Sequence, residues 1–198
     1  MTKIVAITGG IGSGKTTLSD CLKKIGFSVH DSDGVVSSMY NAPNKSFIDF
    51  IKKNFSKDVL QNKKINKKKI TNFIFQNKNI KRKLEKYVHK HVQLSRKKFI
   101  QKNIIAKKNI IFVDIPLLLE NNLEKHFDLV VCIISSKKNR TQRILKKGKF
   151  SIKILNKIFN FQTSDKERRK RSQIIINNNK TKKDFIFNAK KALKEILK

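Results

Sequence analysis

The glycine-rich stretch at residues 9–16, GGIGSGKT, constrains this chain more than any other feature because it fits the pattern G-x-x-x-x-G-K-[ST]. An apolar run precedes it at residues 3–8, and residues 17–25 carry apolar side chains at helical spacing before Gly26. A buried strand, a glycine loop and a helix in this order form the context in which the pattern binds phosphate. A glycine-rich turn that only joins strand to helix is the disfavoured alternative, because both neighbouring segments agree with the motif. The sequence therefore predicts a loop that binds a nucleoside triphosphate.

Each residue type in this loop has its own physical task. Glycine adopts positive φ and lacks the Cβ atom that would keep phosphate oxygens away from the backbone N–H groups. Those N–H groups and the dipole of the following helix attract phosphate. Lys15 is predicted to reach the β- and γ-phosphates, and the Thr16 hydroxyl to ligate Mg²⁺. The other expected contacts to the nucleotide are Gly10, Ile11, Gly12, Ser13, Gly14 and Thr17.

Length and composition fit one domain with a small inserted subdomain. The 198 residues, of which 38% are hydrophobic, can supply a core. No apolar run is long enough to cross a bilayer and the start does not resemble a signal peptide, so we expect a cytoplasmic protein without a membrane partner. Cys21 and Cys132 fall in apolar-periodic segments without metal-ligand spacing, and we expect two buried, reduced thiols.

The net charge of +33 raises the question of a nucleic-acid partner. The lysines are spread over nearly every predicted helix, interleaved with Asn and Ile, and neither zinc-finger spacing nor an RNA-binding aromatic signature accompanies them. We therefore predict a solvated basic surface and no specific nucleic-acid partner, with weak binding at low salt only.

Two carboxylates follow the second predicted strand, at residues 27–30: Asp31 and Asp33. The carboxyl ends of parallel strands form the ligand-binding edge of an α/β sheet. One acid is therefore well placed to act as a base toward a hydroxyl, while the other caps a helix or helps to hold Mg²⁺ through water. Because Ser32 and Asp33 are also good N-cap types, helix capping by this segment is an equally weighted alternative.

Residues 34–108 contain no convincing strand. Amphipathic helices are expected at residues 46–55 and 79–102, with a helix capped by Asn66 and running through Phe75 between them. A crossover between parallel strands needs only one helix, so the surplus predicts an insertion that covers one edge of the site and holds the second substrate. His89 and His91 lie on the last of these helices, where a surface or structural histidine is the commoner case.

The second half of the chain predicts the remaining strands. Residues 109–114 form an apolar run that ends in Asp114, the pattern in which a carboxylate orients Mg²⁺ or its waters. Further strands are expected at residues 129–134 and 174–176, before a closing helix at 181–197. The predicted fold is an α/β, P-loop NTPase three-layer sandwich with a five-stranded parallel sheet.

Two basic helices are predicted between the last two strands, at residues 137–147 and 151–160. This segment carries Arg140, Arg143, Lys146, Lys147 and Lys149. Small-molecule kinases with a phosphate loop have a lid at this place, whose cations close over the transferring phosphoryl group. A solvated helix face is the alternative for each residue, and position favours the arginines. The layout predicts a small-molecule kinase; a GTPase is disfavoured because no N/T-K-x-D motif is found.

Several motifs together resemble the dephospho-CoA kinase family. They are TGGIGSGKT at residues 8–16, the pair Asp31 and Asp33, PLLLE at 116–120 with Asp114 just ahead, and INN at 176–178. His89 matches the family's histidine, and the similarity spans essentially the whole chain. The resemblance implies ATP-dependent phosphorylation of the ribose 3′-hydroxyl of dephospho-CoA, the last step of coenzyme A biosynthesis.

The resemblance also implies residue roles. Asp33 would accept the hydroxyl proton, and Lys15, Arg140 and Arg143 would act on the transferring phosphoryl group. The acceptor contacts would be Asp31, Asp33, His89, Pro116 and Leu117, the Mg²⁺ ligands Thr16 and Asp114, and the residue near the adenine Asn178. The core would comprise about 1–33, 109–136 and 173–198, the acceptor-binding insertion about 34–108 and the lid about 137–172. A monomer or weak homo-oligomer is expected.

Four places depart from the family pattern. Ser37 replaces an arginine, Lys90 a proline after the histidine, Lys147 the second lid arginine, and Ser172 with Gln173 an Ala-Asp pair. Lys147 offers a point charge where an arginine would offer a bidentate fork. The alternatives left open are a kinase of another nucleotide or small hydroxyl acceptor, a nucleic-acid-associated NTPase, and a phosphate-loop protein that binds without turnover.

Overall fold

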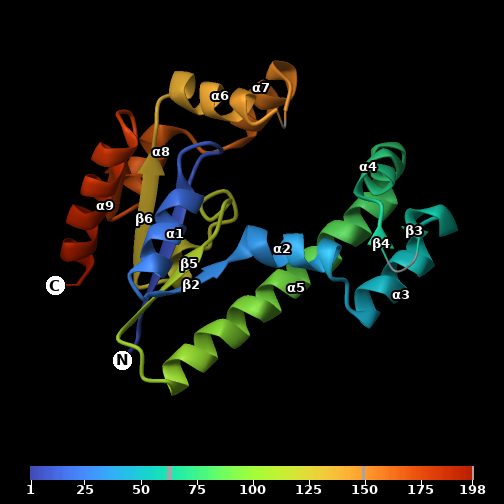
Figure 1. Ribbon diagram of the computed structural model, residues 1–198, viewed down its shortest axis with the longest axis horizontal. Helices are drawn as coiled ribbons and strands as arrows, with labels where there is room; N and C mark the ends of the chain where they lie inside the picture. Colours follow the sequence, from blue (N-terminus) through green and yellow to red (C-terminus); the bar gives the residue numbers. More distant parts are fainter. Residues whose placement is uncertain (62–63, 149, 198) are drawn as a thin grey trace. The chain divides into compact units, whose positions relative to one another are not determined.

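The computed structural model describes residues 1–61, 64–148 and 150–197, and the chain forms two compact units. The first unit comprises both ends of the chain, residues 1–31 and 100–198, and the second comprises residues 32–99. Figure 1 follows the chain through both.

The first unit is built on a five-stranded parallel sheet with the order β2-β5-β1-β6-β7 (Figure 1). Its strands are β1 (Lys3–Gly9), β2 (Ser28–Asp31), β5 (Ile110–Asp114), β6 (Leu129–Ile134) and β7 (Ile174–Asn177). The central strands are continuous apolar runs because both faces of a parallel sheet are covered by other elements. The predicted α/β fold with a five-stranded parallel sheet is confirmed.

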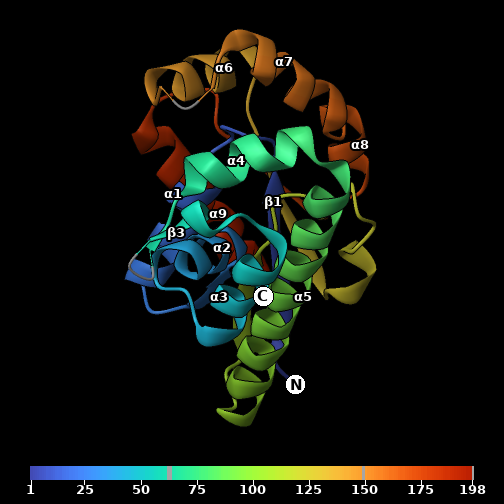
Figure 2. The same ribbon diagram turned by 90° about the vertical axis from the view of Figure 1, so that its right-hand side faces the viewer.

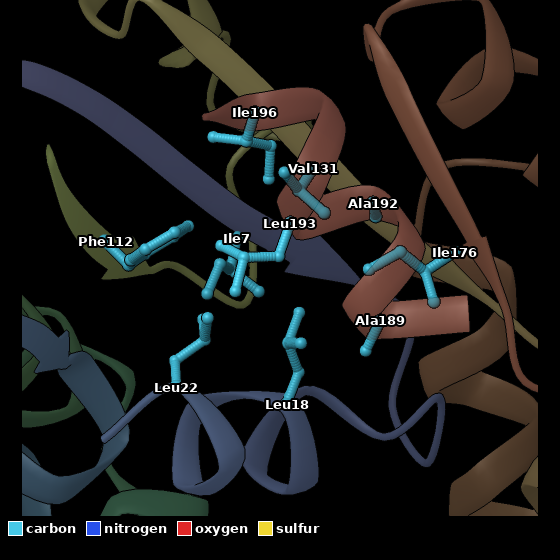
Figure 3. A pocket seen from close by; sticks show the side chains of 10 residues that line it. All are labelled: Ile7, Leu18, Leu22, Phe112, Val131, Ile176, Ala189, Ala192, Leu193 and Ile196. Carbon is cyan, nitrogen blue, oxygen red and sulfur yellow. The ribbon is translucent and has the colours of Figure 1, made fainter. Parts of the chain in front are cut away.

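Two helices, α1 (Lys15–Lys24) and α9 (Lys182–Ile196), share a hydrophobic core with the sheet. Leu18 and Leu22 lie one turn apart on α1 and face Ile7 and Phe112 of the sheet (Figure 3). Each fully buried leucine contributes about 1.5–3 kcal/mol. The small space among these side chains has an entirely apolar lining within the described residues, so it belongs to the core and offers nothing to a triphosphate.

The described chain between β6 and β7 forms three helices: α6 (Lys137–Lys146), α7 (Ile152–Phe161) and α8 (Asp165–Lys170). The first two correspond to the predicted basic helices, with Ser136 and Ser151 as caps. The prediction missed α8. Its signal was present, because the Ser164 hydroxyl accepts the Glu167 N–H in an S-x-x-E sequence. A 3-10 turn, η2 (Glu124–His126), precedes β6.

The second unit is mostly helical. Its elements are α2 (Ser32–Asn41), α3 (Lys45–Asn54), η1 (Lys57–Val59), β3 (Leu60–Gln61), β4 (Lys64–Ile65), α4 (Lys67–Gln76) and α5 (Lys78–Ile105), which continues into the first unit. The expectation of no strand was wrong in one detail: β3 and β4 pair antiparallel. Two-residue strands are too short to show an alternating pattern. No helix in the described part of the chain combines the length and apolarity needed to span a membrane.

The second unit has a hydrophobic core of its own. It contains Met39, Phe47, Ile51, Phe55, Val59, Ile65, Ile70 and Leu84. Around it, α3 and α4 lie beside the first turns of α5 (Figure 2), where Tyr87 stacks on Phe50 with ring centroids 4.4 Å apart. The side chain of Asn66 accepts the Lys69 N–H at the start of α4, which is the predicted cap. This core explains why residues 32–99 form a separate compact unit.

The buried thiol of Cys132 leads to a reactivity prediction. Cys132 is fully buried in β6, whereas Cys21 is only half-buried, so the expectation of two buried thiols holds for one. Burial raises the pKa of the Cys132 thiol to about 11. At about pH 8 only about one thiol in 1,000 would then be the reactive thiolate. We expect iodoacetamide to modify at most Cys21 in the folded protein and both cysteines in guanidinium, as read by peptide mass spectrometry. Equally fast modification of Cys132 in both states would contradict this.

Candidate active site

The phosphate loop joins β1 to α1, and close neighbours surround its glycines. Gly12 and Gly14 have φ values of 75° and 114°, a region that L side chains rarely adopt. A Cβ atom on Gly14 would lie 2.4 Å from Nδ2 of Asn178, and one on Gly12 would lie 2.9 Å from Cδ1 of Ile144. Both positions therefore require glycine for backbone conformation and for space.

Lys15 and Thr16 begin the helix that follows the loop. The Lys15 side chain is half-buried, and its ammonium donates to the carbonyl oxygens of Gly9 at 2.8 Å and Gly10 at 3.4 Å. Thr16 is exposed and Thr17 is half-buried. The N–H groups of the first turn, the Lys15 ammonium and the Thr16 hydroxyl thus lie at the positive end of one helix, where anions bind favourably.

Two carboxylates meet at the carboxyl edge of the sheet. Asp114 is 6% exposed, and its Oδ2 accepts a hydrogen bond from the Ser19 hydroxyl at 3.0 Å. The strand register pairs Asp114 with Ile7 of β1 on one side and with Asp31 of β2 on the other. Neighbouring strands lie about 4.8 Å apart. Hydroxyl and carboxylate oxygens are the protein ligands that Mg²⁺ takes, so Thr16 and Asp114 fit such an ion, with Asp31 beside them.

Arg143 and Asn178 donate hydrogen bonds to backbone carbonyls of the loop. The guanidinium of Arg143 donates to the Gly12 carbonyl at 3.4 Å, the Ser135 hydroxyl at 3.1 Å and the Asn178 carbonyl at 2.9 Å. Asn178 in turn donates through Nδ2 to the Ser13 carbonyl at 2.7 Å. In this arrangement both residues fix the shape of the loop. The expected place of Asn178 beside the adenine stays a prediction.

Arg140 faces the loop more directly. It is 8% exposed, and its guanidinium carbon lies 5.0 Å from the ring centroid of Phe159. A Cβ atom on Gly10 would lie 2.2 Å from Arg140 Nη1, so the guanidinium touches the loop at its first turn. Burial lowers the pKa of Arg140 from its ordinary value, with the charge of Asp165 opposing that shift. An arginine still keeps its charge at every physiological pH.

Three residues outside the predicted set also contact this region. The side-chain oxygen of Gln162 accepts the Ile11 N–H at 3.0 Å, which ties the end of α7 to the loop. Glu120 accepts the Thr163 N–H at 2.9 Å, and Arg168 on α8 is 3% exposed. Glu120 belongs to the PLLLE motif, whereas no local pattern singled out Gln162 or Arg168.

The other predicted residues fall into two groups. Pro116 and Leu117 are half-buried and follow β5, just after Ile115, whose N–H donates to the Ile7 carbonyl at 2.9 Å. Asp33 and His89 belong to the second unit: Asp33 is in the first turn of α2, His89 is on α5, and both are exposed. Their roles toward the acceptor stay predictions. The predicted lid residue Lys149 lies outside the described residues.

A family model of dephospho-CoA kinase matches residues 3–184. The chain belongs to the dephospho-CoA kinase family. This confirms the predicted resemblance and identifies the chain as an ATP-dependent kinase of the last step of coenzyme A biosynthesis. The family assignment favours that activity over the nucleic-acid-associated NTPase left open by the sequence.

Bacterial members of the dephospho-CoA kinase family are similar over most of the chain. The protein of Fusobacterium nucleatum subsp. nucleatum is 33% identical over 183 residues, which cover 92% of each chain. That of Buchnera aphidicola subsp. Schizaphis graminum is 37% identical over 182 residues, or 91% of this chain and 85% of its own. The solved dephospho-CoA kinase of Campylobacter jejuni has a TM-score of 0.74 at 24% identity, covering 99% of this chain and 98% of its own. At that identity the structural similarity supports the fold.

Proposed function

We propose that this chain transfers the γ-phosphoryl group of ATP to the ribose 3′-hydroxyl of dephospho-CoA, forming coenzyme A and ADP. The family assignment supports the acceptor. The observation that carries the chemistry is the meeting of the phosphate loop, Lys15 and Arg140 in one unit, beside the Asp114 edge of the sheet. Phosphoryl transfer needs in-line positioning and charge neutralisation more than covalent chemistry, and these groups provide both.

The residues would divide the work as follows. The loop N–H groups and the Lys15 ammonium hold the β- and γ-phosphates, and Arg140 neutralises charge that develops on the transferring group. Thr16 and Asp114 would hold Mg²⁺, which supplies further neutralisation of the phosphate oxygens when bound. Asp33 accepts the proton of the acceptor hydroxyl. The second unit, residues 32–99, contributes the acceptor-binding surface with His89, and the segment of α6 to α8 acts as the lid.

We further propose that the protein acts in the cytoplasm as a monomer or weak homo-oligomer, without a specific nucleic-acid partner. In support, basic residues occur on helices of both units, including α4, α5, α6 and α9, and are not gathered into one segment. Charges distributed in this way give a diffuse attraction for polyanions that salt screens.

An acceptor-dependence assay tests the reaction. Purified protein with ATP and Mg²⁺ should form ADP only when dephospho-CoA is added, and the product should gain the mass of one phosphoryl group. The 3′-deoxy analogue of dephospho-CoA is the matched control, because it keeps every other contact and should yield no product. Chelation of Mg²⁺ by EDTA should stop turnover. ADP formation that ignores dephospho-CoA but responds to RNA or to another acceptor would refute the proposal.

A further inference from the structure

Two buried guanidinium groups converge on the first turn of the phosphate loop. A Cβ atom on Gly10 would lie 2.2 Å from Nη1 of Arg140 and 3.1 Å from Nη1 of Arg168. Arg140 comes from α6 and Arg168 from α8, so two separate helices direct a positive charge to the same backbone position. Only the absence of a side chain at Gly10 lets both groups approach so closely.

Carboxylates hold Arg168 in this position from two sides. Its Nη1 donates to Oδ1 of Asp165 at 2.9 Å, and its Nη2 lies 3.4 Å from Oε1 of Glu120. The Glu120 side chain is 9% exposed and also accepts the Thr163 N–H. A side chain that is 3% exposed and held at both ends of its fork cannot swing into solvent, so its place beside Gly10 is fixed.

The positive charges around Gly10 exceed the negative charges of the carboxylates that accompany them. The carboxylate of Asp165 forms ion pairs with both arginines: its Oδ1 lies 2.9 Å from Nη1 of Arg168 and its Oδ2 lies 3.8 Å from Nη2 of Arg140. The Asp165 side chain is 34% exposed. The Nε atom of Arg140 is buried and has no hydrogen-bond partner among the described residues. The Lys15 ammonium adds a third cation at the carbonyl oxygens of Gly9 and Gly10. Buried cations this close together are costly unless an anion accompanies them.

The position of Lys15 indicates which phosphate the anion would be. In this motif the lysine contacts the β- and γ-phosphates. Its ammonium lies at Gly9 and Gly10, where the two guanidinium groups also converge. The ammonium and both guanidinium groups are therefore gathered at the start of the loop.

We propose that Arg168 is a second arginine of the phosphoryl-binding site and donates hydrogen bonds to the γ-phosphoryl group of ATP beside Arg140. Glu120 and Asp165 act as positioning residues that orient the guanidinium group of Arg168 toward Gly10. This rests on the proposed function, since it assigns a further contact of the same reaction. The competing interpretation is a purely structural ion pair that fastens α8 to Glu120.

Nucleotide binding separates the two interpretations, because a γ-phosphoryl contact affects ATP and leaves ADP untouched. We would measure the affinity for AMPPNP and for ADP, each with Mg²⁺, by titration calorimetry. The test variants are Arg168→Lys, which keeps the charge but loses the fork, and the double variant Arg168→Met with Glu120→Gln. The double variant removes the buried charge of Glu120 together with its partner and leaves Asp165 with Arg140 at 3.8 Å. Its glutamine still accepts the Thr163 N–H.

Loss of the contact should weaken AMPPNP binding about 10- to 100-fold in the double variant, and less in Arg168→Lys. The affinity for ADP should stay unchanged. Turnover should fall by about 10²- to 10³-fold in the double variant. Arg169→Met is the matched control, because Arg169 is the exposed neighbour on the same helix, and we expect it to change neither affinity nor turnover.

Three results would overturn the proposal. Equal loss of AMPPNP and ADP affinity, or loss of neither, would mean that Arg168 only supports the fold. A lower melting temperature with an unchanged ratio of the AMPPNP affinity to the ADP affinity would lead to the same conclusion. Failure of the acceptor assay would refute the reaction without affecting this test, because the ratio is measured without an acceptor.

Discussion

Replacement of Lys15 by alanine should lower turnover by about 10³-fold or more. The ammonium is the only cation that the motif itself places on the β- and γ-phosphates, and its present bonds to the Gly9 and Gly10 carbonyls keep it at the start of the loop. Such a loss corresponds to about 4 kcal/mol of transition-state stabilisation. Steady-state ADP release with saturating dephospho-CoA measures it.

The control for this prediction is Lys24→Ala at the other end of the same helix, where the lysine is exposed. It removes the same side chain and charge but should leave turnover unchanged. Because Lys15 is half-buried and its ammonium donates to the carbonyl oxygens of Gly9 and Gly10, Lys15→Ala should shift the melting temperature by no more than about 5 °C. Turnover within about 10-fold of the unmodified protein would contradict a phosphate role for Lys15.

Several elements of the fold could be predicted because their sequence signals are local. The loop, the apolar strand before it, the helix after it and the cap at Asn66 each depend on neighbouring residues, and the structure has all of them. The burial of Asp114 beside β1 also follows from a short pattern, an apolar run that ends in an acid. Short-range patterns of this kind are the ones that sequence periodicity reports.

The elements that were missed had weak or ambiguous signals. The α8 sequence consists entirely of charged residues, so it shows no apolar stripe, and only its Ser164 cap indicated a helix. The β3–β4 hairpin consists of two-residue strands. Short and polar elements form mainly because neighbouring parts of the structure hold them, which a sequence pattern does not record.

The contacts that shape the site were the hardest to foresee. Asn178 and Ser13 are 165 residues apart in the chain, and Ile11 and Gln162 are 151 apart. Their hydrogen bonds exist only because the strand order brings β7 and the end of α7 to the loop. In a chain with 47 lysines and arginines, nothing local marks Arg168 as one of the buried cations.

The Asp33→Asn variant should lose turnover by about 10²- to 10⁴-fold while its affinity for ATP stays unchanged. Asparagine cannot accept the hydroxyl proton, so the variant removes a general base from the chemical step. The change is conservative for the helix, because Asp33 is exposed in the first turn of α2 and asparagine has nearly the same size and shape as aspartate. Single-turnover phosphorylation of dephospho-CoA, with ATP binding measured separately, distinguishes the two effects.

This substitution decides between the two roles that the sequence left equally weighted for the acid pair. If Asp33 only supports the start of α2, Asp33→Asn should keep full turnover, and Asp33→Ala should lower the melting temperature. Asp49→Asn provides a matched control, because Asp49 is another exposed carboxylate on a helix of the same unit. Asp31→Asn addresses the neighbouring acid: because Asp31 is the register partner of Asp114, its loss should raise the Mg²⁺ concentration needed for half-maximal turnover. If Asp33 is the general base and Asp31 helps to hold Mg²⁺, the two variants should therefore differ. Asp33→Asn should lower the rate of the chemical step, and Asp31→Asn should change the dependence of turnover on Mg²⁺.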